Sequence, residues 1–165
     1  MKQRVMFVCT GNICRSPFAH GLLEHLLREH SLEHQMEVAS SGTHAHVGEA
    51  PHPLAITVAA VDYGIDISGL RGRQFERADF ARFDHLIALD RSHLARLHTL
   101  KPAASRVEPR LLLAGMTQGG DAEVPDPYGR DRSEFEYVGR LIMLGVQRLV
   151  TTLAAGKTGI NVRGK

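Results

Sequence analysis

The chain has 165 residues, of which 43% are hydrophobic, and this is enough for one compact domain with a sizeable core. Its formal net charge of +2 is too small an excess to indicate a nucleic-acid-binding surface. The longest early apolar run, Val5 to Cys9, is too short for a signal peptide or a membrane span. We therefore expect a cytoplasmic protein with no nucleic-acid or membrane partner.

The first predicted element is a buried strand over Arg4 to Cys9, an apolar run that stops at a Gly-Asn turn. Helical periodicity begins after Ser16 and Pro17 and continues to Glu29. Ser16 suits the N-cap of this helix, and Pro17 suits its first helical position. The chain therefore opens with a strand, a short loop and a helix.

Strands and helices continue to alternate along the chain. We predict strands over Met36 to Ser40, His85 to Asp90 and Arg106 to Leu113, and helices over Leu54 to Tyr63, from Arg91 onward, and over Ser133 to Ala155 with Ser133 as its cap. This alternation predicts an α/β fold in which a parallel sheet is covered on both faces. Active crevices of such sheets lie beyond the carboxyl ends of the strands, where the first loop follows the first strand.

Both cysteines of the chain lie in or beside this loop, in the stretch VCTGNICRSP. A disulfide scaffold would carry more cysteines and spread them along the chain, so Cys9 and Cys14 indicate chemistry instead. If the loop curls above the helix that follows, its backbone N–H groups and the helix dipole form a cradle for a tetrahedral dianion. Gly11 permits the tight turn, Asn12 tolerates left-handed geometry, and Arg15 can bind two equatorial oxygens.

The same positive field favours a thiolate, so we predict that Cys9 is a nucleophile at the bottom of the cradle. Transfer of a phosphoryl group to its sulfur also requires a proton for the leaving oxygen. The candidate donor is Asp126, whose neighbours Pro125 and Pro127 restrict the local backbone. Its carboxyl group could protonate the leaving group and later accept a proton from the attacking water.

These motifs resemble the signatures of the low molecular weight protein tyrosine phosphatases along nearly the whole chain. The loop CTGNICRSP is similar to the family's phosphate-binding signature, and DPYG at Asp126 to Gly129 is similar to its general-acid motif. Ser40 to Thr43, Gly64 to Asp66 and Phe83 to Asp90 also match. The resemblance implies a flavodoxin-like three-layer sandwich with a four-stranded parallel sheet, over residues 1–156. Residues 157–165 lack periodicity, so we expect a flexible tail there.

The resemblance also implies a metal-independent phosphatase without a cofactor, acting through a phosphocysteine on tyrosine-phosphorylated proteins or small aryl phosphates. Position by position, Cys9 is the nucleophile, Arg15 the phosphate clamp and Asp126 the general acid. His46 and Tyr128 are the walls that contact the substrate. The phosphate-binding residues are Thr10, Gly11, Asn12, Ile13, Cys14, Arg15 and Ser16.

Further roles carried over from the family concern support of the nucleophile. Asn12 is expected to hold the loop through a hydrogen bond to Ser40, and Ser16 to donate a hydrogen bond to the sulfur of Cys9. Cys14 matches the second loop cysteine of the family, which can trap an oxidised nucleophile as a disulfide. This chain has Ser41 where the family usually has Ala.

Two other functions fit part of the same pattern. An arsenate reductase on this scaffold would need a further cysteine outside the loop, and this chain has only its two loop cysteines. A non-catalytic phosphate-binding or nucleotide-binding module would leave Asp126 idle, and no Gly-x-Gly-x-x-Gly fingerprint follows the first strand. The phosphatase is therefore the main hypothesis.

Asp90 and three histidines each allow two interpretations. Asp90 follows the third predicted strand. There it can support the segment around Asp126, called the acid loop below, or it can cap the next helix. His44, His46 and His52 invite a metal site, but their spacing matches no common zinc pattern. We expect them to be solvated loop histidines and expect no bound metal.

A second loop, from Ser68 to Gln74, departs from the family pattern. The family often has His where Leu70 stands, and this departure affects any polar network there. Arg71, Arg73 and Arg77 are expected to form a solvated face, although they could attract acidic phosphoprotein partners.

Overall fold

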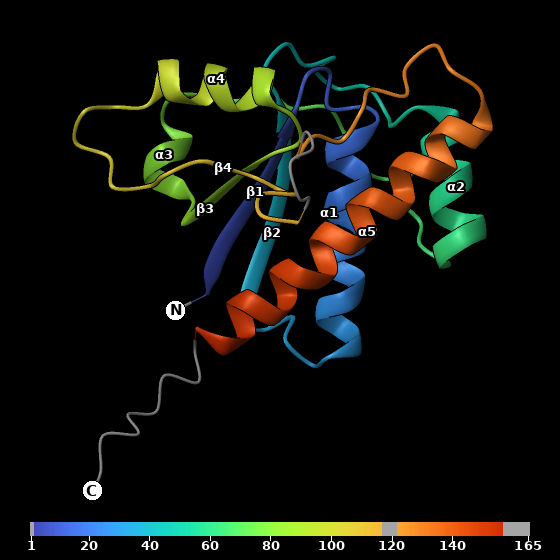
Figure 1. Ribbon diagram of the computed structural model, residues 1–165, viewed down its shortest axis with the longest axis horizontal. Helices are drawn as coiled ribbons and strands as arrows, with labels where there is room; N and C mark the ends of the chain where they lie inside the picture. The colour runs from blue at the N-terminus through green and yellow to red at the C-terminus, as the bar shows by residue number, and fades with distance from the viewer. Residues whose placement is uncertain (1, 117–121, 157–165) are drawn as a thin grey trace, which may run out of the picture.

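The computed structural model describes residues 2–116 and 122–156, and its strands and helices alternate along most of the chain (Figure 1). The elements are β1 (Gln3–Cys9), α1 (Arg15–Glu29), β2 (Met36–Gly42), α2 (Pro53–Tyr63), α3 (Asp79–Arg82), β3 (His85–Ala88), α4 (Arg91–Leu100), β4 (Arg110–Leu111) and α5 (Arg132–Ala155). The strands form one parallel sheet in the order β2-β1-β3-β4. The predicted four-stranded parallel sheet is therefore confirmed.

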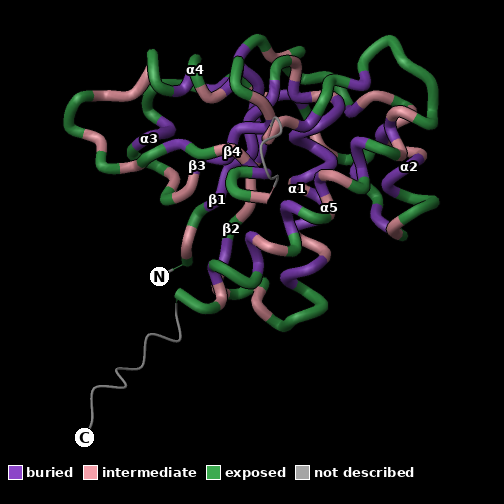
Figure 2. Tube along the Cα trace, viewed as in Figure 1, coloured by how far each residue is buried: buried purple, intermediate pink, exposed green. Residues whose placement is uncertain are grey.

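Helices cover both faces of the sheet, as the three-layer prediction requires. Side chains of β1 alternate between the faces because successive residues of a strand point in opposite directions. Val5 and Phe7 pack in a core with α1, α2 and α5, whereas Met6 and Val8 pack in a second core with α3 and α4. The central strand is consequently buried on both faces, which explains its continuous apolar sequence (Figure 2).

The first residues of two helices differ from the prediction. α1 begins at Arg15, with Cys14 at the N-cap position and no side-chain cap, so Ser16 is not the cap and Pro17 is not the first helical residue. Pro17 is still tolerated there, because N–H groups in a first helical turn have no partner within the helix. α5 is capped by Asp131, which accepts a hydrogen bond from the N–H of Glu134. Ser133 instead donates to Asp131, so its predicted role as the cap is wrong.

The strands also differ in extent from the predictions. β4 contains only Arg110 and Leu111, much less than the predicted range from Arg106 to Leu113, because only these residues pair with β3. β3 ends at Ala88, and Asp90 is the N-cap of α4. The short helix α3 was not expected from the sequence. The predicted tail over residues 157–165 lies outside the described residues.

The C-terminal helix α5 is long and apolar enough, by length and composition, to cross a membrane. In the fold it packs along α1 and α2 as a core helix (Figure 1). Its buried side chains include Phe135, Val138, Ile142 and Val146, which recur at helical spacing and face the sheet-side core. Burial against other helices accounts for its apolar composition.

Candidate active site

The loop between β1 and α1 is held by hydrogen bonds that turn its carbonyl groups outward. The carbonyls of Cys9, Thr10 and Gly11 accept from the N–H groups of residues 43, 44 and 46, each at 2.9 Å, and that of Ile13 accepts from residue 52 at 2.7 Å. Because the N–H and C=O of a trans peptide point in opposite directions, this arrangement turns loop amides inward. Asn12 adopts the left-handed conformation, with φ of 57°.

A pocket of about 150 Å³ opens at this loop. Its lining combines the loop with residues from two later parts of the chain: Cys9, Thr10, Gly11, Ile13, Cys14, Arg15, His44, His46, Asp126 and Tyr128. The predicted nucleophile, clamp, acid and both predicted walls therefore line the same cavity. This position, beyond the carboxyl end of β1, agrees with the sequence-based expectation.

Cys9 ends β1 with 2% of its surface exposed, and its Sγ lies 2.9 Å from the Oγ of Ser16. Ser16 accepts a hydrogen bond from Nδ2 of Asn12 at 2.7 Å, and its Oγ also lies 3.2 Å from the carbonyl oxygen of Ser41. The hydroxyl group is thus oriented by two neighbours while it faces the sulfur. This use of Ser16 explains why it does not cap α1.

The predicted hydrogen bond between Asn12 and Ser40 is wrong. Ser40 lies instead 3.1 Å from Nδ1 of His20, because its side chain lies on the α1 face of β2. The Oδ1 of Asn12 accepts from the backbone N–H of Arg73 at 2.9 Å. The loop around residue 73 therefore supplies the support that was expected from β2.

Arg73 is anchored by a carboxylate with no exposed surface. Its guanidinium group donates to both oxygens of Asp79, at 3.0 and 2.6 Å, and the N–H of Glu76 donates to the same carboxylate at 2.8 Å. Arg73 is thus a structural residue and not part of a purely solvated face. Leu70 packs against the hydrophobic core, so the polar link to Asn12 comes from Arg73 and not from that position.

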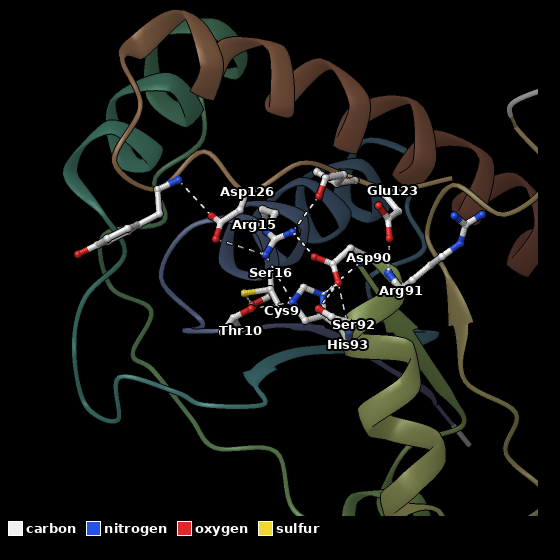
Figure 3. Close-up of polar contacts among 12 residues, drawn as sticks. Cys9, Thr10, Arg15, Ser16, Asp90, Arg91, Ser92, His93, Glu123 and Asp126 are labelled. Carbon is white, nitrogen blue, oxygen red and sulfur yellow. Dashed lines mark hydrogen bonds and ion pairs between the residues drawn. The ribbon is translucent and has the colours of Figure 1, made fainter. Parts of the chain in front are cut away.

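Arg15 is held with 3% of its side chain exposed. Figure 3 shows its guanidinium group between Asp90 and Asp126. Its Nη1 donates to Oδ2 of Asp90 and to the carbonyl of Val124, both at 2.8 Å, and its Nη2 lies 3.8 Å from Oδ2 of Asp126. A buried arginine with these partners has a fixed orientation. The contact with Val124 also ties the acid loop to the phosphate-binding loop.

Asp90 caps α4, which is one of the two roles considered for it from the sequence, and it also holds Arg15, which in turn contacts Val124 beside the proposed acid. Its Oδ1 caps α4 by accepting from the N–H of His93 at 3.1 Å, and its Oδ2 orients Arg15. Burial raises the pKa of Asp90, but hydrogen bonds from Ser92 and Arg15 oppose this and hold the pKa below its usual value. Asp90 is therefore a carboxylate at neutral pH.

His93 belongs to the site but was missed in the sequence. Its Nδ1 lies 3.2 Å from both the backbone nitrogen and Oδ1 of Asp90, and its Nε2 lies 2.8 Å from Oγ1 of Thr10 and 3.4 Å from Nη2 of Arg15. Burial lowers the pKa of His93 to about 4, against the opposing effect of Asp90, so the ring is neutral at pH 7. The sequence feature that could have identified His93 is its position three residues after Asp90, the N-cap of α4. In a capping box the residue at this position bonds back to the N-cap backbone.

The acid loop is organised by a local turn. Oδ1 of Asp126 accepts from the backbone N–H of Tyr128 at 3.1 Å, which is the geometry of an Asx turn. Upstream, the N–H of Val124 donates to the carbonyl of Leu89 at 2.8 Å at the end of β3. The carboxyl group of Asp126 thereby stays near Arg15 while 55% of its side chain is exposed.

The histidines do not behave as one solvated group. His46 lies against the backbone of Gly11 and contacts Glu49, with its Nδ1 3.5 Å from the carboxylate, and His44 also lines the pocket. His52 is not a solvated loop residue: it caps α2 and stacks on Phe135. Within residues 2–116 and 122–156, no three His, Cys, Asp or Glu side chains are grouped so that they could hold a metal ion.

Cys14 is buried beside the nucleophile, and both cysteines are free thiols in the structure. Burial, together with the nearby Cys9, raises the pKa of Cys14 to about 12. Cys14 therefore remains protonated at neutral pH. Cys14 lines the same pocket as Cys9. The formation of a disulfide between them on oxidation stays a prediction.

Comparison with known proteins agrees with this geometry. The family model for the low molecular weight phosphotyrosine protein phosphatases matches residues 4–158. A low molecular weight protein-tyrosine-phosphatase of Streptomyces coelicolor is 40% identical over 141 residues, covering 82% of this chain and 84% of its own. The crystal structure of YfkJ from Bacillus subtilis superposes with a TM-score of 0.87 at 31% identity, covering 96% of this chain and 98% of its own.

A more distant neighbour has the same fold and carries a molecule at its active site. The protein tyrosine phosphatase of Entamoeba histolytica, crystallised with Hepes in the active site, matches with a TM-score of 0.87 at 27% identity, over 94% of this chain and 99% of its own. The family match spans the strand, the loop and the acid motif that line the pocket around Cys9. The chain belongs to the low molecular weight phosphotyrosine protein phosphatase family, and it is a protein-tyrosine-phosphatase.

Proposed function

We propose that the enzyme hydrolyses phosphotyrosine and other aryl phosphate monoesters in two steps, through a phosphocysteine on Cys9. One observation carries this proposal: Asp126 lines the same small pocket as Cys9 and Arg15, although it lies far along the chain from the loop that carries these two residues. A nucleophile, a phosphate clamp and an acid in one cavity are the components that phosphomonoester transfer requires.

In the first step the Cys9 thiolate attacks phosphorus, and the bond between phosphorus and the ester oxygen breaks. Asp126 donates its proton to the departing phenolate, and Arg15 with the inward loop amides stabilises the charge on the equatorial oxygens. The contacts of Arg15 with Asp90 and Val124 hold the guanidinium group at the pocket before the substrate binds. Preorganised charge of this kind costs no rearrangement at the moment of reaction.

In the second step a water molecule attacks the phosphocysteine and displaces the sulfur. Asp126, now a carboxylate, accepts a proton from this water, and inorganic phosphate is released. Ser16 stabilises the departing thiolate through its hydroxyl group, which lies 2.9 Å from the sulfur. After the second step Cys9 is again a thiolate and Asp126 again carries its proton. Because these side chains supply the nucleophile and the proton, the proposed cycle needs neither a metal ion nor a cofactor.

The substrates of the family are phosphoproteins, and we propose tyrosine-phosphorylated proteins and small aryl phosphates for this member. His46 and Tyr128 both line the pocket, so an aryl ring can lie between two planar side chains. We also propose a cytoplasmic location, because Cys9 must remain a reduced thiol and the two cysteines are unpaired. No nucleic-acid or membrane partner forms part of this proposal.

The experiment is hydrolysis of p-nitrophenyl phosphate and of a phosphotyrosine peptide in the presence of a chelator. We expect turnover that is unaffected by chelation and abolished in Cys9→Ser. His34→Asn, a change at an exposed histidine between α1 and β2, is the matched control and should retain the wild-type rate. Activity that depends on added metal would contradict the mechanism.

Rapid-quench trapping tests the intermediate directly. With a ³²P-labelled aryl phosphate, label should appear on the peptide that contains Cys9 and disappear as phosphate is released. A fully active enzyme that never carries label on this peptide would show that the reaction follows direct attack by water. The trapping result thus separates the two-step route from a one-step hydrolysis.

A further inference from the structure

His52 connects the phosphate-binding loop, α2, α5 and the acid loop. Its backbone N–H donates to the carbonyl of Ile13 at 2.7 Å, and its Nδ1 accepts from the N–H of Leu54 at 3.1 Å. Its ring stacks on Phe135, with centroids 4.9 Å apart and planes inclined by 28°. The rings of His52 and Tyr128 are nearly perpendicular, with centroids 5.9 Å apart and planes inclined by 80°. The side chain is therefore fixed on three sides.

The segment that carries the proposed acid depends on this ring. Upstream of Asp126, the chain is anchored by Val124, which is fully buried. Downstream, Tyr128 is 61% exposed, and its ring contacts the ring of His52. The backbone N–H of Tyr128 donates to Oδ1 of Asp126 at 3.1 Å. Displacement of Tyr128 would therefore displace the carboxyl group.

We propose that His52 is a positioning residue for the general acid, acting through Tyr128 on Asp126. It does not touch the reacting atoms. Stacking on Phe135 holds the ring of His52 in place, and the ring of Tyr128 contacts the His52 ring in a T-shaped arrangement, which is favourable for aromatic rings. The same contact sets the wall of the pocket where the aryl ring binds. This inference rests on the proposed role of Asp126.

Two properties of the His52 side chain can be separated by substitution. Asn retains an oxygen that can accept from the N–H of Leu54, so His52→Asn preserves the cap of α2 but removes the ring. Phe retains a planar ring that can stack on Phe135, so His52→Phe preserves the aromatic contacts but removes the cap. If the ring positions the acid loop, the two variants differ in their effect on acid catalysis.

The readout is the dependence of kcat/KM on the leaving group, because this parameter includes the step in which Asp126 protonates the ester oxygen. p-Nitrophenolate leaves with little assistance, whereas phenolate needs the proton. For His52→Asn we expect kcat/KM for phenyl phosphate to fall about tenfold, with a change of about twofold or less for p-nitrophenyl phosphate. His52→Phe should show the wild-type ratio between the two substrates.

A double-mutant cycle identifies the route through Tyr128. Tyr128→Ala should raise the discrimination between the substrates as His52→Asn does, and the combined variant should add little, because both act on one contact. Thermal unfolding of each variant, with His34→Asn as control, measures any general loss of stability. A uniform loss for both substrates, or equal behaviour of the Asn and Phe variants, would overturn the positioning role.

Asp126→Asn separates a failure of this inference from a failure of the proposed function. If Asp126 is the acid, this variant must itself lose far more activity with phenyl phosphate than with p-nitrophenyl phosphate. Strong discrimination in Asp126→Asn with none in His52→Asn would refute the role of His52 alone. Absence of discrimination in Asp126→Asn would refute the acid, and the role of His52 with it.

Discussion

Acidification should destabilise the protein through His93, because this ring is neutral and 1% exposed in the folded state. Burial lowers its pKa from the usual 6.5 to about 4, so between these two pH values the unfolded chain binds a proton that the folded protein does not. The stabilising contribution is present above pH 6.5 and is lost as the pH falls toward 4. At 1.36 kcal/mol for each pKa unit, the full loss is about 3 kcal/mol.

Most of this loss falls in an accessible pH range. Integration of proton binding between pH 7 and pH 5 gives about 2 kcal/mol for a histidine with these two pKa values. The assay is urea unfolding of the wild-type protein and of His93→Asn at both pH values. Asn is similar in size and does not titrate, and every other ionisable group is common to the two proteins, so the difference between them isolates His93.

We expect the free energy of unfolding of the wild type to fall by about 2 kcal/mol more than that of His93→Asn between pH 7 and pH 5. His34→Asn removes an exposed histidine and should follow the wild type. If the wild type and His93→Asn lose stability in parallel, the ring does not stay neutral in the folded protein.

Two further predictions concern the loops around the site. In Gly72→Ala the new Cβ would lie 2.0 Å from the carbonyl oxygen of His46, so we expect the free energy of unfolding, measured by chemical denaturation, to fall by about 1–3 kcal/mol or more. Gly69→Ala is the control, because nothing lies within 4 Å of its new Cβ, and it should lose much less stability. Equal losses in the two variants would contradict the steric argument. Mild peroxide should oxidise the Cys9 thiolate to a sulfenic acid, from which Cys14 displaces water to form a disulfide. Inactivation should then be reversed by a thiol reductant, and peptide mass spectra without this bond would rule out the protective pairing.

The sequence was most informative where the evidence was local. The apolar run into Cys9, the Gly-Asn turn and the helical periodicity up to Glu29 lie next to one another, so the strand, loop and helix could be predicted together. Asp126 was recognisable because the prolines beside it mark a rigid turn and because DPYG resembles a family motif. The predicted parallel sheet followed from the alternation of strands and helices, which is also a local pattern.

Helix caps and short strands were predicted less well because tertiary contacts compete with local preference. A serine before a helix is a good cap in isolation, but the hydroxyl group of Ser16 is used by Cys9 and Asn12 instead. The extent of β4 depends on pairing with β3, which no periodicity within residues 106–113 reveals. Such outcomes depend on which partner lies nearby in the folded chain.

Only the tertiary structure decided how the catalytic side chains are held. Arg15 is oriented by Asp90, Asn12 by the backbone of Arg73, and the acid loop by His52, each through contacts between segments far apart in the sequence. The parallel register of β1 with β2 and β3 brings their carboxyl ends to one edge of the sheet, and this placement determines which loops meet. The residue types at the site were therefore visible in the sequence, whereas their partners depended on the register of the sheet.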